Sequence, residues 1–215
     1  MVERDRDLKY RLAIFDFDGT LADSYPWFAR VIDVVAEEFG LRRISAEERQ
    51  ALRSCHPRDI LKRLDVPLWK VPRIARRIRQ LKAVDAHSLP LFPGVVDLLH
   101  QLSARGIARA IVSSDAESNI RLTLGAETAA LIDHYACGAG LFGKRVKLRQ
   151  VLARFAVAPD EAIYVGDEVR DGEAAKAAGI AFAAVSWGYT APEALRQHGP
   201  DRFFTSVAEI GPAIA

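Results

Sequence analysis

Short apolar runs recur along the chain, and each is separated from the next by a longer amphipathic stretch. Runs of this length and character are typical of buried parallel strands. The stretches between them carry apolar residues at the i, i+3, i+4, i+7 spacing of helices, as in 95–102 and 148–155. The alternation predicts an α/β fold with a doubly wound parallel sheet. The six runs cover residues 12–15, 107–112, 135–137, 162–165, 181–185 and 203–204.

One long interval interrupts this alternation and shows helical patterns without a convincing strand. Its first helix ends at Gly40, and its second begins with a capping box at residues 45–48. Its last helix has one apolar stripe, formed by Val71, Ile74, Ile78 and Leu81. We therefore expect an inserted helical domain over 22–90 and a core domain formed by 1–21 and 91–215.

Charge is nearly balanced over the chain but is unevenly distributed along it. The 30 Lys and Arg against 28 Asp and Glu leave a net charge of +2, which argues against a nucleic-acid partner. Residues 49–82 nevertheless contain 11 basic and 2 acidic side chains. Two interpretations of this segment stay open: a solvated helix face, or a surface that steers an anionic substrate.

Simple counts exclude other classes of protein. Cys55 and Cys137 do not make a disulfide framework, and the five histidines lack the spacing of a zinc site. The longest uncharged run, 177–192, is shorter than the roughly 20 residues that span a bilayer. The charged N-terminus lacks the apolar core of an export signal. We expect a cytoplasmic protein with no membrane partner.

Acidic residues follow two of the predicted strands directly. Residues 16–20 read Asp-Phe-Asp-Gly-Thr after the first run, and Asp167 and Asp171 follow the fourth. Because parallel strands end at one edge of a sheet, we expect these groups to converge where ligands bind in open α/β sheets. Buried carboxylates need a compensating charge, and Mg²⁺ prefers oxygen ligands. The sequence therefore predicts a magnesium site at this edge.

Hydroxyl and ammonium groups follow at two further places. Ser113 and Ser114 come after the second run, where hydroxyls and free N–H groups bind oxyanions, although a serine there also serves as a helix N-cap. Lys144 precedes a predicted helix, and Lys147 stands one turn further on. A lysine at this place can neutralise a phosphate charge. The choice between the two lysines stays open.

The order of these residues resembles the four motifs of the haloacid dehalogenase-like (HAD) hydrolase superfamily. The matching positions are residues 16–20, then Ser113, then Lys144, then Gly166-Asp167 with Asp171. The resemblance spans about residues 11–190. The helical interval and the stretch 185–189 look like the superfamily's phosphoglycolate phosphatase-like branch. The resemblance implies a HAD-like, Rossmann-like core with an inserted α-helical cap.

The resemblance also implies a role for each acidic residue. Asp16 would be the nucleophile that forms an aspartyl phosphate. Asp18 would protonate the leaving oxygen and later deprotonate the attacking water. Mg²⁺ would be held by Asp16, the backbone carbonyl of Asp18 and Asp167, with Asp171 orienting metal-bound water.

The remaining motif residues would bind the phosphate group. Thr20, Ser113 and Ser114 are the implied substrate-binding residues, and Lys144 would supply positive charge to the transition state. Asp18 favours a phosphate ester, because dehalogenating members of the superfamily lack this second Asp.

We therefore expect a Mg²⁺-dependent phosphatase for a small phosphorylated metabolite, with phosphoglycolate as the leading candidate. The alternatives are a sugar phosphomutase of the same fold and a non-catalytic phospho-ligand-binding protein. A monomer and a homodimer are both compatible with the sequence.

Overall fold

Six parallel strands form one sheet in the order β3-β2-β1-β4-β5-β6. The structure is a computed structural model that describes residues 9–140 and 143–214. Every apolar run predicted from the sequence contributes a strand, so the predicted doubly wound parallel sheet is confirmed. The strands are β1 (Leu12–Phe15), β2 (Ala108–Val112), β3 (His134–Ala136), β4 (Ala162–Gly166), β5 (Ala181–Val185) and β6 (Arg202–Phe204).

Strand boundaries differ from the predicted ones by about a residue. Strand β2 begins at Ala108 and not at Ile107, because the Ile107 N–H donates back to the carbonyl of Leu102 and so closes the preceding helix. Strand β3 begins at His134, which pairs with Ala110 of β2. Apolarity alone does not separate a strand residue from a buried residue at the end of a helix.

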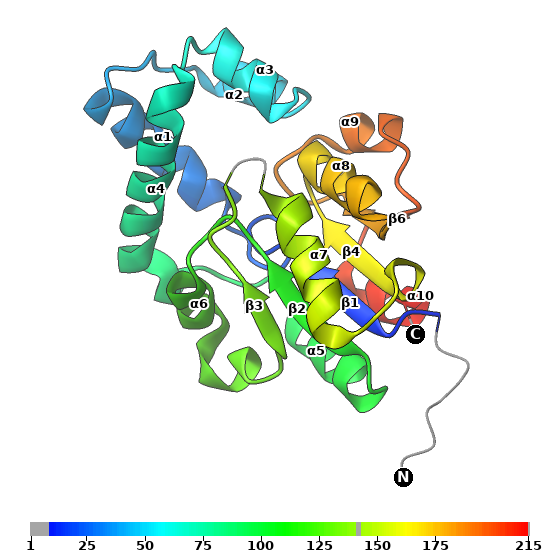
Figure 1. Ribbon diagram of the computed structural model, residues 1–215. Coiled ribbons are helices and arrows are strands. Elements are labelled where there is room, and N and C mark those ends of the chain that lie inside the picture. The colour runs from blue at the N-terminus through cyan, green and yellow to red at the C-terminus, as the bar shows by residue number, and fades with distance from the viewer. Residues whose placement is uncertain (1–8, 141–142, 215) are drawn as a thin grey trace.

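Helices cover both faces of the sheet (Figure 1). Apolar residues of α5, α6 and α10 pack on one face, and those of α7, α8 and α9 pack on the other. Alternate strand residues serve the two faces, with Phe15 in the first cluster and Ile14 in the second. These helices are α5 (Val95–Ala104), α6 (Glu117–Ala129), α7 (Lys144–Phe155), α8 (Val169–Ala178), α9 (Pro192–Gln197) and α10 (Ile210–Ile214).

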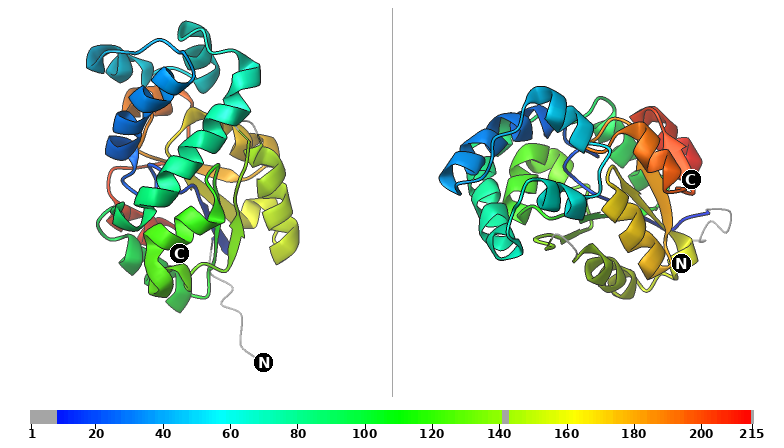
Figure 2. Two further views of the ribbon diagram at one scale, coloured as in Figure 1. Left: turned by 90° about the vertical axis from the view of Figure 1, so that its left-hand side faces the viewer. Right: turned by 90° about the horizontal axis from the view of Figure 1, so that it is seen from above.

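The interval between β1 and α5 contains only helices and turns among its ordered elements. Figure 2 shows the four longer helices of this interval grouped beyond one edge of the sheet. Trp27 joins the first to the last, because its indole N–H donates to Asp85 at 2.8 Å. The domain boundaries 22 and 90 stay a prediction. The helices are α1 (Tyr25–Glu38), α2 (Ala46–Leu52), α3 (Pro57–Arg63) and α4 (Val71–Asp85).

The described residues also form four short 3-10 helices: η1 (Leu68–Lys70), η2 (Ala86–Ser88), η3 (Pro159–Glu161) and η4 (Val207–Glu209). Ser45 caps α2, since its hydroxyl accepts the Glu48 N–H at 3.1 Å. The Glu48 side chain pairs with Arg42 instead of closing the capping box that the sequence suggested. Within the described ranges, no helix has the length and apolarity to cross a bilayer.

Strand order determines where the motifs meet. Strand β1 lies between β2 and β4, with Phe15 in register with Ile111 and Val165. The residues that follow these three strands therefore emerge side by side at one edge of the sheet.

Candidate active site

Asp16 directly follows the central strand β1 and lies almost out of contact with solvent, at 3% exposure. Its backbone N–H donates to the carbonyl of Val165 at 2.8 Å, which ties this position to β4. Its Oδ1 accepts the N–H of Phe17 at 2.8 Å, and its Oδ2 accepts Lys144 Nζ at 2.5 Å. The carboxylate is therefore fixed from two sides.

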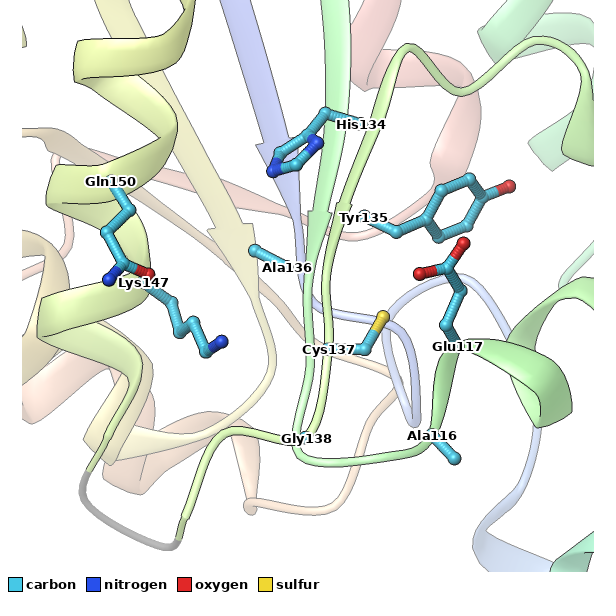
Figure 3. Close-up of a pocket in the computed structure, with 9 residues that line it drawn as sticks. All are labelled: Ala116, Glu117, His134, Tyr135, Ala136, Cys137, Gly138, Lys147 and Gln150. Carbon is cyan, nitrogen blue, oxygen red and sulfur yellow. The ribbon is translucent and has the colours of Figure 1, made fainter.

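Lys144 is the first residue of α7, and its ammonium is as buried as the carboxylates around it. Besides Asp16, it donates to Oδ1 of Asp171 at 2.6 Å. Lys147 lies elsewhere: it points into a pocket of about 510 Å³ beside β3, together with Cys137 and Glu117 (Figure 3). Of the two candidate lysines, only Lys144 contacts the carboxylates. That pocket contains none of the other predicted site residues.

Two further aspartates come from the segment between β4 and α8. Asp167 accepts the Thr20 hydroxyl on Oδ1 and the Tyr189 N–H on Oδ2, both at 2.7 Å. Asp171 lies in the first turn of α8 and accepts the N–H of Glu168 at 3.1 Å, as a capping residue does. Its other oxygen accepts a hydrogen bond from Lys144, so the same carboxylate caps α8 and forms part of the site.

Asp16, Asp167 and Asp171 bring carboxylate oxygens within 4.8 Å of one another. Burial raises the pKa of Asp16 to about 7, against the attraction of Lys144. Burial and the neighbouring carboxylates raise the pKa of Asp167 well above its usual range. Three buried carboxylates and one contacting ammonium leave negative charge that a divalent cation offsets, and a set of hard oxygen donors suits such an ion. The residues present therefore fit Mg²⁺.

Two glycines allow the chain to approach Asp167 closely. A Cβ on Gly188 would lie 2.2 Å from the Cβ of Asp167. A Cβ on Gly19 would lie 2.4 Å from Asp167 Oδ2, and Gly19 has a φ of +79°, which disfavours other residues. Side chains at either position would displace this carboxylate.

Asp18 lies outside the carboxylate cluster, with 26% of its side chain exposed. Its Oδ1 accepts a hydrogen bond from Lys82 Nζ, and the same ammonium forms an ion pair with Asp115 at 2.8 Å. Burial lowers the pKa of an ammonium, but the two carboxylates outweigh burial and raise the pKa of Lys82. Neither Lys82 nor Asp115 was among the predicted site residues.

The predicted hydroxyl residues lie around these clusters without joining them into one hydrogen-bond network. Thr20 contacts Asp167, so its hydroxyl proton is engaged there. Ser113 is buried after β2 and accepts the N–H of Asp115 at 3.1 Å within the loop, whereas the N-cap position of α6 is Ala116, so neither serine caps this helix. Ser114 is half-buried, and its carbonyl accepts Arg79 at 3.2 Å. Their roles toward a substrate stay predictions.

The inserted helices also reach the segment that holds Asp167. Arg53, at the end of α2, donates to the carbonyls of Gly188 and Tyr189 at 2.7 and 3.0 Å. The Tyr189 ring packs edge-on against Tyr25 of α1, with centroids 5.1 Å apart. Part of the basic segment 49–82 thus contacts the core directly and is not a freely solvated face.

A sequence signal for Lys82 existed. Lys82 follows Ile78 by four positions and so continues the apolar stripe of α4. A lysine on a buried stripe needs a carboxylate partner, which makes such a residue a candidate for a site. Arg53 carried no comparable signal, because its partners are backbone carbonyls.

Comparison with known proteins agrees with this geometry. The profile of the haloacid dehalogenase-like hydrolases matches residues 13–185. A phosphoglycolate phosphatase of Synechococcus elongatus is 34% identical over 202 residues, covering 94% of this chain and 95% of that protein. The phosphoglycolate phosphatase of Escherichia coli (strain K12) is 28% identical, covering 93% and 90%.

Solved structures share the fold. A putative phosphoglycolate phosphatase from Lactobacillus plantarum superposes with a TM-score of 0.80 at 22% identity, covering 94% of this chain and 98% of that one. CbbY from Rhodobacter sphaeroides, in complex with phosphate, gives 0.70 at 22% identity, covering 94% and 96%. The expected fold class and the expected enzyme class, a phosphoric monoester hydrolase, are confirmed. The chain belongs to the haloacid dehalogenase-like hydrolase family, in its phosphoglycolate phosphatase-like branch.

Proposed function

We propose that the chain is a Mg²⁺-dependent phosphatase that hydrolyses a small phosphate monoester through an aspartyl phosphate on Asp16. One observation carries this proposal: Asp16 is fixed at the end of β1 against Lys144, beside the buried carboxylates of Asp167 and Asp171. A structural role needs no such concentration of buried like charge, which costs folding free energy.

The reaction has two halves. In the first, a carboxylate oxygen of Asp16 attacks phosphorus, the bond to the ester oxygen breaks, and Asp18 donates a proton to that oxygen. In the second, Asp18 takes a proton from water, and the water oxygen attacks phosphorus. Inorganic phosphate leaves, and the Asp16 carboxylate is restored. Asp16 and Asp18 suit these different tasks because one is buried and the other is partly exposed.

Charge compensation comes from Lys144 and from the metal site. Lys144 holds Asp16 in place and adds positive charge beside the transferring group. Asp16 and Asp167 would hold Mg²⁺ with the backbone carbonyl of Asp18, and Asp171 would orient a water on it. When bound, the ion screens the repulsion between the carboxylate nucleophile and a phosphate dianion.

The substrate must reach a buried nucleophile. Asp16 and Asp167 have at most 3% exposure, so movement of helices α1–α4 relative to the sheet would admit the substrate. Thr20, Ser113 and Ser114 are the proposed phosphate-binding residues. Phosphoglycolate is the proposed substrate, because the relatives that match over nearly the full chain bear that name. The cytoplasmic location and the oligomeric state stay predictions.

The test is phosphate release from a panel of small phosphate esters, phosphoglycolate included, with and without Mg²⁺. We expect Mg²⁺-dependent release by the wild type and none by Asp16→Asn. The preferred ester then identifies the substrate class. A mutase would instead accumulate an isomeric phosphate ester, and a binding protein would retain ligand without turnover. Release that persists in Asp16→Asn contradicts the covalent mechanism.

A further inference from the structure

Lys82 is a buried ammonium at the last turn of α4, placed between two carboxylates of the core. The residue is 2% exposed, and Nζ contacts Asp18 Oδ1 and, at 2.8 Å, Asp115. The ammonium also lies 5.3 Å from the ring centroid of Phe17. An ammonium removed from water is stable only when paired, so this lysine has a defined place.

The end of α4 that carries Lys82 is fixed independently of Asp18. The carbonyl of Arg79 accepts Asn119 Nδ2 of α6 at 3.0 Å, and its guanidinium donates to the carbonyl of Ser114. The Thr123 hydroxyl donates to the carbonyl of Ala86 at 2.8 Å, just beyond the helix. Lys82 therefore approaches Asp18 from an element docked on α6.

Asp115 is fixed in its turn. Its Oδ1 accepts the N–H of Ala116 at 2.7 Å and Asn119 Nδ2 at 2.9 Å, while its carboxylate pairs with Lys82. Asp115 thus gives Lys82 a second carboxylate partner besides Asp18, and this partner is held in place at the start of α6.

Only one oxygen of Asp18 is engaged by this arrangement. Lys82 bonds Oδ1, and the structure shows no hydrogen bond to Oδ2 from the residues it describes, 9–140 and 143–214. We propose that Lys82, anchored by Asp115, is a positioning residue that holds Oδ1 of Asp18 so that Oδ2 faces the reacting ester oxygen. This inference rests on the proposed function, in which the proton on Asp18 passes to that oxygen as its bond to phosphorus breaks.

The experiment compares esters whose leaving groups differ in their need for a proton. An alkyl phosphate expels a basic alkoxide and needs the acid, whereas p-nitrophenyl phosphate expels a weakly basic phenolate. In Lys82→Met we expect kcat on the alkyl ester to fall about 100-fold and kcat on p-nitrophenyl phosphate less than about 10-fold, with KM little changed. The exposed Arg73 of the same helix gives the matched control Arg73→Met, which should match the wild type.

A second variant separates positioning from charge balance. Lys82→Met leaves Asp115 without its cation, whereas Lys82→Met/Asp115→Asn removes the charge on both. We expect the double variant to recover thermal stability but to keep the selective loss on the alkyl ester. Equal losses on both esters, or recovery of alkyl ester hydrolysis in the double variant, would overturn the proposal. A wild type inactive on both esters overturns the proposed function as well, so the two failures are distinguishable.

Discussion

Two clusters at the edge of the sheet are built alike but differ in their balance of charge. In each, a buried lysine is shared between two aspartates: Lys144 between Asp16 and Asp171, and Lys82 between Asp18 and Asp115. The first cluster contains a third carboxylate, Asp167, and the second does not. We call the first the inner cluster and the second the outer cluster. The inner cluster therefore suits a divalent cation, whereas the outer cluster leaves the Asp18 carboxylate partly exposed to solvent.

Asp16 and Asp18, the two aspartates for which we propose different tasks, have different surroundings although one residue separates them. Asp16 is buried against α7 and β4, elements of the core, whereas Asp18 meets a lysine from the inserted helices. The core thus fixes Asp16, the proposed nucleophile, and the inserted helices contact Asp18, the proposed proton donor. Substitutions in the two clusters should therefore fail in different ways.

The largest effect is expected for Asp16→Asn. The amide keeps the shape of the side chain but removes the nucleophile, so turnover should fall to less than about one-thousandth on every ester. Single-turnover phosphate release measures this loss, and circular dichroism checks the fold. The companion variant Asp18→Asn should lose more activity on an alkyl phosphate than on p-nitrophenyl phosphate. If the two variants lost the same activity on both esters, the proposed difference in role between Asp16 and Asp18 would be wrong.

The next largest effect is expected for Lys144→Met. Removing the ammonium leaves Asp16 and Asp171 buried without their cation, which should lower the free energy of unfolding by about 3–5 kcal/mol without Mg²⁺. Urea denaturation with and without Mg²⁺ measures the change. Lys147→Met is the matched control and should change stability by less than about 0.5 kcal/mol. If Lys147→Met were the more damaging variant, the contacts of Lys144 would not reflect its function.

Much of the fold was predictable, because strand and helix periodicities follow directly from burial on a two-sided sheet. The inner cluster was predictable for the same reason: Asp16 and Asp167 each follow an apolar run, and parallel strands bring such positions together. The position of an aspartate directly after an apolar run is visible in the sequence of a single element.

The contact of Asp18 with Lys82, and of Lys82 with Asp115, was not predicted, because it depends on packing between elements distant in sequence. Lys82 lies 64 positions from Asp18. The packing of α4 on α6 brings the two residues together, and such packing produces no characteristic residue spacing in the sequence. The choice between Lys144 and Lys147 was also open in the sequence, since it depends on which side of α7 faces the sheet edge. Only the three-dimensional arrangement of α7 shows which of the two lysines contacts the carboxylates.

A third prediction concerns pH and metal. The folded protein raises the pKa of Asp16 from 3.8 to about 7, chiefly by burial, so the folded state holds this proton more tightly than the unfolded chain. Ionisation of Asp16 should therefore lower the stability of the metal-free protein as pH rises from about 4 to about 7. Mg²⁺ favours the ionised form, so it should raise the melting temperature more at pH 8 than at pH 5. Thermal melts in EDTA and in Mg²⁺ test this, and equal shifts at both pH values would contradict a metal held by Asp16.

The smallest effect is expected for Thr20→Val, which replaces a hydroxyl by a methyl group of similar size. Its bond to Asp167 Oδ1 is lost, so Mg²⁺ affinity should weaken about 10-fold. Thr20→Ser retains the hydroxyl and should stay near the wild type. Mg²⁺ titrations of phosphate release measure the affinity. A raised KM for substrate with unchanged Mg²⁺ affinity would instead assign Thr20 to phosphate binding. The comparison of the two clusters would then change. The Thr20 hydroxyl, which donates to Asp167 in this structure, would instead bind the substrate phosphate during turnover.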